Sequence, residues 1–208
     1  MGMLEERLDP RTAALLIIDI QNDFCAEGGY LQRERNYNVS FADGLVTKIG
    51  NVTAVARRLG MCVVWVRSIY DFKYLGAAEI AKRGEEGCCL EGTWGVEFFR
   101  LSPAPDEVVI DKHCFSAFRN PRLDSYLRER GIRTLIMTGV ATNVCVDSTL
   151  REGFFLGYHI VVLEDCVGSN SQAGHEGTLA TVRNNIGQVI SSSTAVEVLA
   201  RATATNSV

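Results

Sequence analysis

A chain of 208 residues that is 47% hydrophobic and 22% charged has the composition of one globular domain with a sizeable core. Its formal net charge of -4 provides no basic surface for nucleic acid. No run reaches the roughly 18 apolar residues of a membrane span, and the first residues match neither a signal peptide nor a myristoylation pattern. Seven cysteines, an odd number without a Cys-x-x-Cys pair, predict free thiols in a reduced, cytoplasmic protein.

Strand and helix patterns alternate along the chain. Apolar, β-rich runs predict strands at 13–19, 61–67, 107–112, 133–138, 158–165 and 188–190. Helical spacing predicts helices at 39–59, 120–130, 143–155, 172–184 and 193–201. The polar segment 21–38 predicts a loop, and 68–105 predicts a long excursion that lines a pocket or a subunit contact. We therefore expect one α/β domain over 1–208 with an open, mostly parallel sheet and flexible ends at 1–10 and 202–208.

The segment 134–151 holds a strand, a short turn and the start of a helix. The strand pattern ends at Gly139, and a helical pattern begins near Asn143. Thr142 or Asn143 is the expected N-cap, and Cys145 lies in the first helical turn. There the helix dipole favours the thiolate, and free backbone N–H groups can hold an oxyanion. The alternative for this segment alone is a buried structural cysteine.

Three reactive side chains follow predicted strands, at the edge where parallel sheets form their sites. They are Asp19, Lys112 and Cys145. Cys145 can attack a carbonyl carbon, Lys112 can stabilise the thiolate, and Asp19 can accept the thiol proton and return it to a leaving amine. Singly, Asp19 can be a turn cap and Lys112 a surface charge, but their coincidence predicts a catalytic triad.

Three segments together resemble the isochorismatase-like cysteine hydrolases over nearly the whole chain. They are Leu15–Phe24 with Gly28–Tyr30, Ile110–Phe118 and Thr138–Cys145. The resemblance implies a six-stranded parallel sheet with helices on both faces, in a Rossmann-like arrangement. It also implies a homo-oligomer, either dimer or tetramer, that acts on a small molecule.

The same resemblance implies a non-proline cis peptide at Val140–Ala141 and an oxyanion hole at the N–H groups of Ala141 and Cys145. No cofactor is implied. Nicotinamidases of the family hold a metal with histidines between the triad aspartate and lysine, here Asp19 and Lys112. The histidines of this chain are His113, His159 and His175, so we expect no metal site of that kind.

Within the family, the chain looks most like the ureidoacrylate amidohydrolases, with biuret and carbamoylsarcosine amidases as close alternatives. The segments that carry this likeness are Gly28–Leu31, Phe118–Asp124 and Ala141–Phe155, whereas 67–71 and the excursion 68–105 depart from it. It implies hydrolysis of a C–N bond in a small amide, ureido or carbamoyl compound, with ammonia release through a thioester. The alternatives are isochorismatase-type vinyl-ether hydrolysis, which needs no cysteine, and a non-catalytic binding protein.

Substrate contacts are expected from loops around the triad. The predicted residues are Phe24, Tyr30, Arg67, Phe118, Arg119 and Asn143. Arg35, Arg67 and Arg119 are candidates for a bidentate ion pair with a substrate carboxylate, so we expect acidic substrates slightly ahead of neutral ones.

Overall fold

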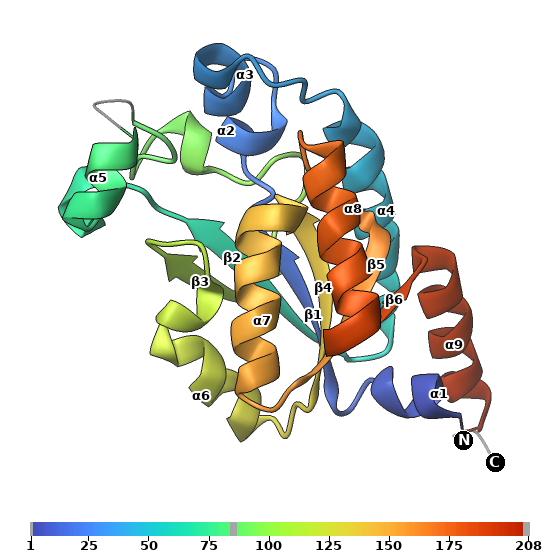
Figure 1. The fold of residues 1–208 in the computed structure, drawn as a ribbon. Helices are drawn as coiled ribbons and strands as arrows, with labels where there is room; N and C mark the ends of the chain where they lie inside the picture. Colours follow the sequence, from blue (N-terminus) through green and yellow to red (C-terminus); the bar gives the residue numbers. More distant parts are fainter. Residues whose placement is uncertain (1, 84–86, 206–208) are drawn as a thin grey trace.

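The computed structural model describes residues 2–83 and 87–205. Its six strands form one sheet in the order β3-β2-β1-β4-β5-β6, and every neighbouring pair is parallel (Figure 1). The strands are β1 Ala13–Ile18, β2 Cys62–Ser68, β3 Val108–Lys112, β4 Thr134–Val140, β5 His159–Gly168 and β6 Gln188–Ile190. This sheet confirms the predicted fold class.

The α-helices are α1 Met3–Arg7, α2 Asn22–Cys25, α3 Tyr30–Arg35, α4 Phe41–Arg58, α5 Ala77–Arg83, α6 Pro121–Glu129, α7 Asp147–Phe155, α8 Gln172–Thr181 and α9 Ser192–Thr205. Short 3-10 turns lie at Phe72–Tyr74, Trp94–Val96 and Ala117–Arg119, and π-helical turns lie at Thr142–Val146 and Val182–Ile186. No helix of the described residues is long and apolar enough to cross a membrane.

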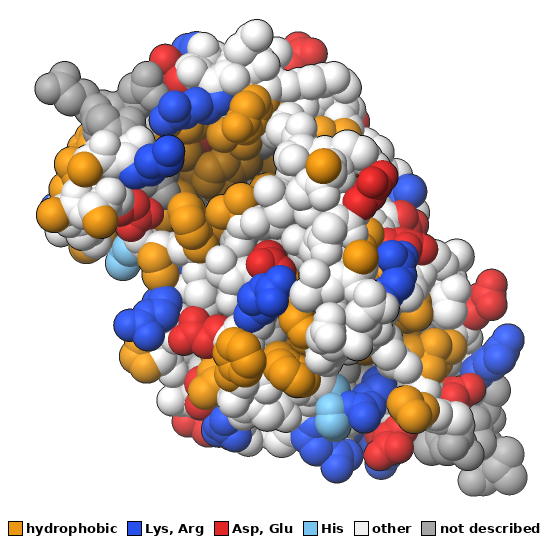
Figure 2. All heavy atoms as spheres, viewed as in Figure 1, with side chains coloured by type: hydrophobic (Ala, Val, Ile, Leu, Met, Phe, Trp, Pro, Cys, Tyr) orange, Lys and Arg blue, Asp and Glu red, His pale blue; other side chains and the backbone are white. Residues whose placement is uncertain are grey.

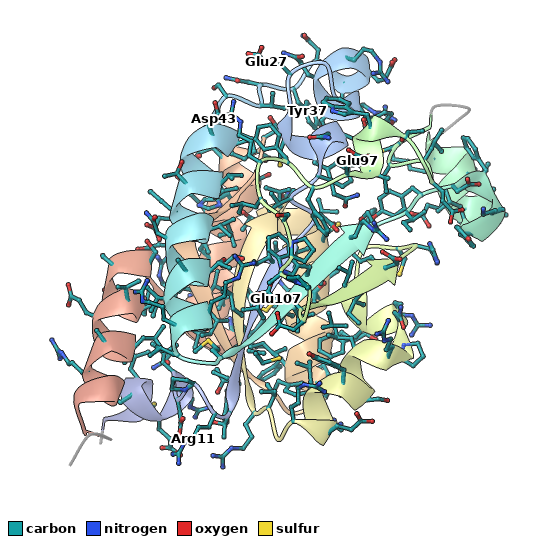
Figure 3. The ribbon with its side chains drawn as sticks, turned by 180° about the vertical axis from the view of Figure 1, so that it is seen from behind. Arg11, Glu27, Tyr37, Asp43, Glu97 and Glu107 are labelled. Carbon is teal, nitrogen blue, oxygen red and sulfur yellow. The ribbon has the colours of Figure 1, made fainter. Side chains whose placement is uncertain are left out.

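Helices cover both faces of the sheet. On β1, Leu15 and Ile17 pack with residues of α4 and α9, whereas Leu16 and Ile18 pack with residues of α6, α7 and α8. Figure 1 shows α6, α7 and α8 in front of the sheet, and the reverse view of Figure 3 brings α4 and α9 forward. Burial on both faces explains why β1 is an unbroken apolar run rather than an alternating one.

Helix α6 begins and ends as its sequence predicts. The Arg122 N–H donates to Asn120 Oδ1 over 3.0 Å, and Pro121 occupies the first turn, where its missing N–H costs no hydrogen bond. Gly131 follows the helix with a φ of 66°, a left-handed conformation that favours glycine.

Several irregular segments contain more helix than the sequence predicts. The segment expected to be a loop, 21–38, holds α2 and α3. The N-terminal end forms α1, which contacts α9, and Leu8 after it is 1% exposed. The expected tail is helical to residue 205, while residues 206–208 lie outside the described part. Tertiary packing supports these elements, because helices this short are marginal in isolation.

Candidate active site

The fold brings Asp19, Lys112 and Cys145 into contact, although they are far apart in the chain. Lys112 Nζ lies 2.8 Å from Asp19 Oδ2 and 3.4 Å from Cys145 Sγ. Asp19 follows β1, Lys112 ends β3, and Cys145 lies in the π-turn after β4. All three are buried, with Cys145 the most exposed at 6%.

Unusual backbone conformations shape this edge of the sheet. Asp19 has a left-handed φ of 54°, which is uncommon for a residue with a side chain and costs on the order of 1–3 kcal/mol. Gly139 has a φ of 112°, and a Cβ there would collide with the carbonyl oxygen of Ile18. The peptide bond between Val140 and Ala141 is cis, as the family resemblance implied.

Lys112 contacts both other members of the cluster and two further polar groups. Besides Asp19 and Cys145, its ammonium donates to Ser68 Oγ at 2.7 Å and to the Cys114 carbonyl oxygen at 3.1 Å. Burial pushes the pKa of Lys112 down, but the negative charge of Asp19 opposes this and the pKa stays well above its usual value. Lys112 is therefore a fixed cation.

Burial acts on Cys145 in the opposite direction to the helix dipole and favours the thiol over the thiolate. Burial raises its pKa to about 12, and the charge of Lys112 only partly opposes this effect. The α-helix α7 begins at Asp147, after the π-turn, so Cys145 is not in the first α-helical turn. Asp19 Oδ2 pairs with Lys112, and the Asp19 side chain also faces the Cys145 thiol, whose pKa it helps to raise.

The raised pKa of Cys145 predicts how the free protein reacts with iodoacetamide. The thiolate fraction, and with it alkylation of Cys145, should rise about tenfold for each pH unit from neutral pH to about pH 10. Peptide mass mapping at a series of pH values measures this rate residue by residue. A plateau at neutral pH would show that a resting thiolate is present.

Thr142 and Asn143, the residues expected to cap the helix, contact side chains outside the turn instead. Thr142 Oγ1 is 2.9 Å from His175 Nδ1, and Asn143 Oδ1 accepts a hydrogen bond from Ser169 Oγ at 2.6 Å. Neither side chain caps the π-turn, whose N-cap is Ala141. These contacts instead tie the turn to α8 and to the end of β5.

A pocket of about 280 Å³ opens over Cys145 and Asp19. Its aromatic lining is Phe24, Tyr30, Tyr37, Phe41, Tyr70 and Phe115, and its polar lining includes Asn143, Ser169, Asn170 and Ser171. Figure 2 shows a hollow with hydrophobic walls below α3, and Figure 3 places Tyr37 at this end of the molecule. Among the described residues, no arginine or lysine lines the pocket.

The structure separates the predicted substrate contacts into two groups. Phe24, Tyr30 and Asn143 line the pocket, whereas Arg67, Phe118 and Arg119 do not.

Other contacts hold the three predicted residues that do not line the pocket. Arg67 donates to Asp111, its partner in the β2–β3 register, at 2.7 Å. Phe118 is buried in the core, with its ring beside Gly153 of α7. Arg119 is exposed and forms an ion pair with Glu152 at 3.8 Å.

Sequence reasoning missed Ser68, Tyr70 and Cys88. Tyr70 is the most informative, because its hydroxyl lies 3.8 Å from Cys145 Sγ and 3.4 Å from Lys112 Nζ. Burial raises its pKa well above the usual value, so it stays a neutral hydroxyl. Ser68 is the last residue of β2, so the rule that selected residues at strand ends also applies to it, whereas Tyr70 lies two residues beyond the strand.

Removing only the Tyr70 hydroxyl should weaken turnover without closing the pocket. Tyr70→Phe is expected to lower kcat about 10- to 100-fold, since a hydrogen bond to a charged group contributes about 1.5–3 kcal/mol. The pH profile of kcat should shift as well, because the hydroxyl lies beside the titrating thiol. Tyr37→Phe, on the pocket wall, is the matched control. Equal activity of the two variants would contradict this role.

Comparisons with known proteins agree with this geometry. The isochorismatase domain matches residues 13–194. The chain is 39% identical over 184 residues to a ureidoacrylate amidohydrolase of Enterobacter sp. (strain 638), covering 80% of this chain and 78% of that protein. A cysteine hydrolase from Pseudomonas syringae pv. phaseolicola 1448A superposes with a TM-score of 0.85 at 26% identity, covering 94% of this chain and 96% of that one. An N-carbamoylsarcosine amidase from Thermoplasma acidophilum superposes with a TM-score of 0.72 at 26% identity, covering 87% of this chain and 96% of that one.

Proposed function

We propose that this chain, which belongs to the isochorismatase family, is a cysteine-dependent amidohydrolase that cleaves a C–N bond of a small amide, ureido or carbamoyl compound. The observation that carries the proposal is a buried thiol beside a fixed ammonium and a carboxylate at the floor of a pocket. Asp19, Lys112 and Cys145 are the proposed catalytic residues.

Acylation begins when Asp19 takes the proton of Cys145 and the sulfur attacks the substrate carbonyl carbon. Lys112, 3.4 Å from the sulfur, stabilises the negative charge as it forms. We assign the oxyanion to the backbone N–H groups of Ala141 and Cys145. When the C–N bond breaks, Asp19 returns the proton to the nitrogen, and ammonia leaves a thioester on Cys145.

Hydrolysis of the thioester uses the same groups. Asp19 takes a proton from water, the hydroxide attacks the thioester carbon, and the sulfur leaves as a thiolate that Asp19 reprotonates. The products are the free acid and the thiol enzyme. A ureido substrate gives a carbamate, which loses carbon dioxide.

Ammonia release from a panel of small amides, ureides and carbamoyl compounds tests the activity directly. The panel should include ureidoacrylate, biuret and N-carbamoylsarcosine, because relatives of this chain are named for two of these compounds. Isochorismatase-type ether hydrolysis is the second candidate, and pyruvate formed from isochorismate reports it. Failure of every compound with a correctly folded protein would favour a binding role.

The aromatic pocket and one arginine near its wall lead to a prediction about substrate charge. Arg35 donates to the hydroxyl of Tyr30, a residue that lines the pocket, at 2.8 Å. Arg35→Gln should raise KM about 10- to 100-fold for a carboxylate substrate and leave its neutral amide analogue unaffected. Arg119→Gln is the matched control. Equal use of the acid and amide forms by the unaltered protein would rule out charge recognition.

We further propose that the protein works as a cytoplasmic homo-oligomer, a dimer or tetramer. Seven free cysteines fit a reducing compartment, and exposed Phe154 and Phe155 at the end of α7 offer apolar surface to a second copy. Light scattering of the purified protein measures the subunit number.

A further inference from the structure

A second group of thiols lies beside the pocket, apart from the triad. Cys88 and Cys89 bring their Sγ atoms to 3.9 Å, and a carboxylate oxygen of Asp23 completes a set whose members lie within 4.8 Å of one another. Cys88 is 2% exposed, Cys89 is fully buried and Asp23 is 8% exposed. The proposed mechanism uses none of these side chains.

The spacing of the two sulfurs suits a tetrahedral metal ion. With zinc–sulfur bonds of about 2.3 Å, two thiolates on a tetrahedral ion stand about 3.8 Å apart. Buried cysteines alone need no metal, because a thiol packs well as a small apolar group. Here, however, a carboxylate is buried with them, and the partners described for it are backbone N–H groups rather than a cation.

The backbone holds this arrangement in place. Cys89 has a left-handed φ of 49°, and its N–H donates to Asp23 Oδ2 at 2.6 Å. The Tyr30 N–H donates to Asp23 Oδ1 at 3.0 Å. Each carboxylate oxygen keeps a second lone pair for a ligand bond. Strained residues of this kind concentrate where function requires them.

The pocket gives a metal ion access to these side chains and leaves one coordination position of the ion open. Cys88 lines the pocket, so an ion can enter there and keep its fourth position for water. The triad thiol is a poorer ligand, because the Lys112 ammonium lies 3.4 Å from Cys145 Sγ and repels cations.

We propose that Cys88, Cys89 and Asp23 bind one thiophilic divalent cation of the zinc class, with its fourth position toward the pocket. Binding replaces two S–H protons by two metal–sulfur bonds and releases both protons to solvent, so affinity should rise with pH.

Metal-free protein, titrated with zinc chloride and then with cobalt chloride, tests the site. We expect about one ion per chain, and for cobalt a thiolate-to-metal charge-transfer absorption in the near ultraviolet. Cys89→Ser should lower the affinity more than about 100-fold, whereas Cys145→Ser and Cys114→Ser should leave it unchanged.

Three results would overturn the site. They are zinc binding that disappears with Cys145→Ser, binding that survives Cys89→Ser, and a cobalt complex of the unaltered protein without charge-transfer absorption. The last result needs no variant, so it holds even if Cys89→Ser fails to fold. None of the three bears on ammonia release, which tests the proposed hydrolase separately.

Discussion

Cys145→Ser is expected to lower kcat at least about 10³-fold, because serine in the same place is a far weaker nucleophile. Its hydroxyl has a much higher pKa than a thiol, and Asp19 is too weak a base to ionise it. The side chain is nearly isosteric, so the fold and its thermal midpoint should be unchanged. Initial rates of ammonia release measure the effect on the best substrate of the panel.

Cys114→Ser is the control for this substitution. Cys114 is half-buried. Its backbone carbonyl oxygen, rather than its sulfur, accepts a hydrogen bond from Lys112. Its variant should keep most of the activity. Retention of more than a few per cent of turnover by Cys145→Ser would exclude the covalent mechanism.

Lys112→Met should damage both activity and stability. It keeps the aliphatic stem but leaves the buried carboxylate of Asp19 without its cation, which costs about 3–5 kcal/mol of unfolding free energy. Turnover should fall about 10²- to 10³-fold, since the forming thiolate loses its electrostatic stabilisation. Urea unfolding and ammonia release measure the two effects.

The double variant Asp19→Asn with Lys112→Met separates the two effects. Removing both charges leaves no buried ion unpaired, so most of the lost stability should return, with a coupling of about 0.5–3 kcal/mol. Activity should stay absent, because the proton acceptor is gone as well. Restored turnover, or a Lys112→Met protein as active and stable as the original, would show that the triad is wrongly assigned.

The local sequence by itself determined the strands, the longer helices and the candidate triad. Apolar runs such as 13–18 are long enough to identify parallel strands, and Asn120, Pro121 and Gly131 mark the ends of a helix by chemistry that acts within a few residues. The strand-end rule then selected Asp19, Lys112 and Cys145, because parallel strands deliver their last residues to one edge.

Only the tertiary structure decided the protonation and the surroundings of these groups. Burial depends on the whole core, and it reverses the effect that local position suggested for Cys145 by raising its pKa to about 12. The same holds for Arg67, which looked available in the sequence but pairs with Asp111 on the neighbouring strand.

Residues of the irregular segments show this limit most clearly. Tyr70 and Cys88 lie where hydrophobic periodicity fades, so no local pattern says which way they point. The described residues of this excursion bring the Tyr70 hydroxyl 3.8 Å from Cys145 Sγ and turn Cys88 toward the pocket. These contacts join residues that are far apart in the chain, so they cannot be predicted from a short segment of the sequence.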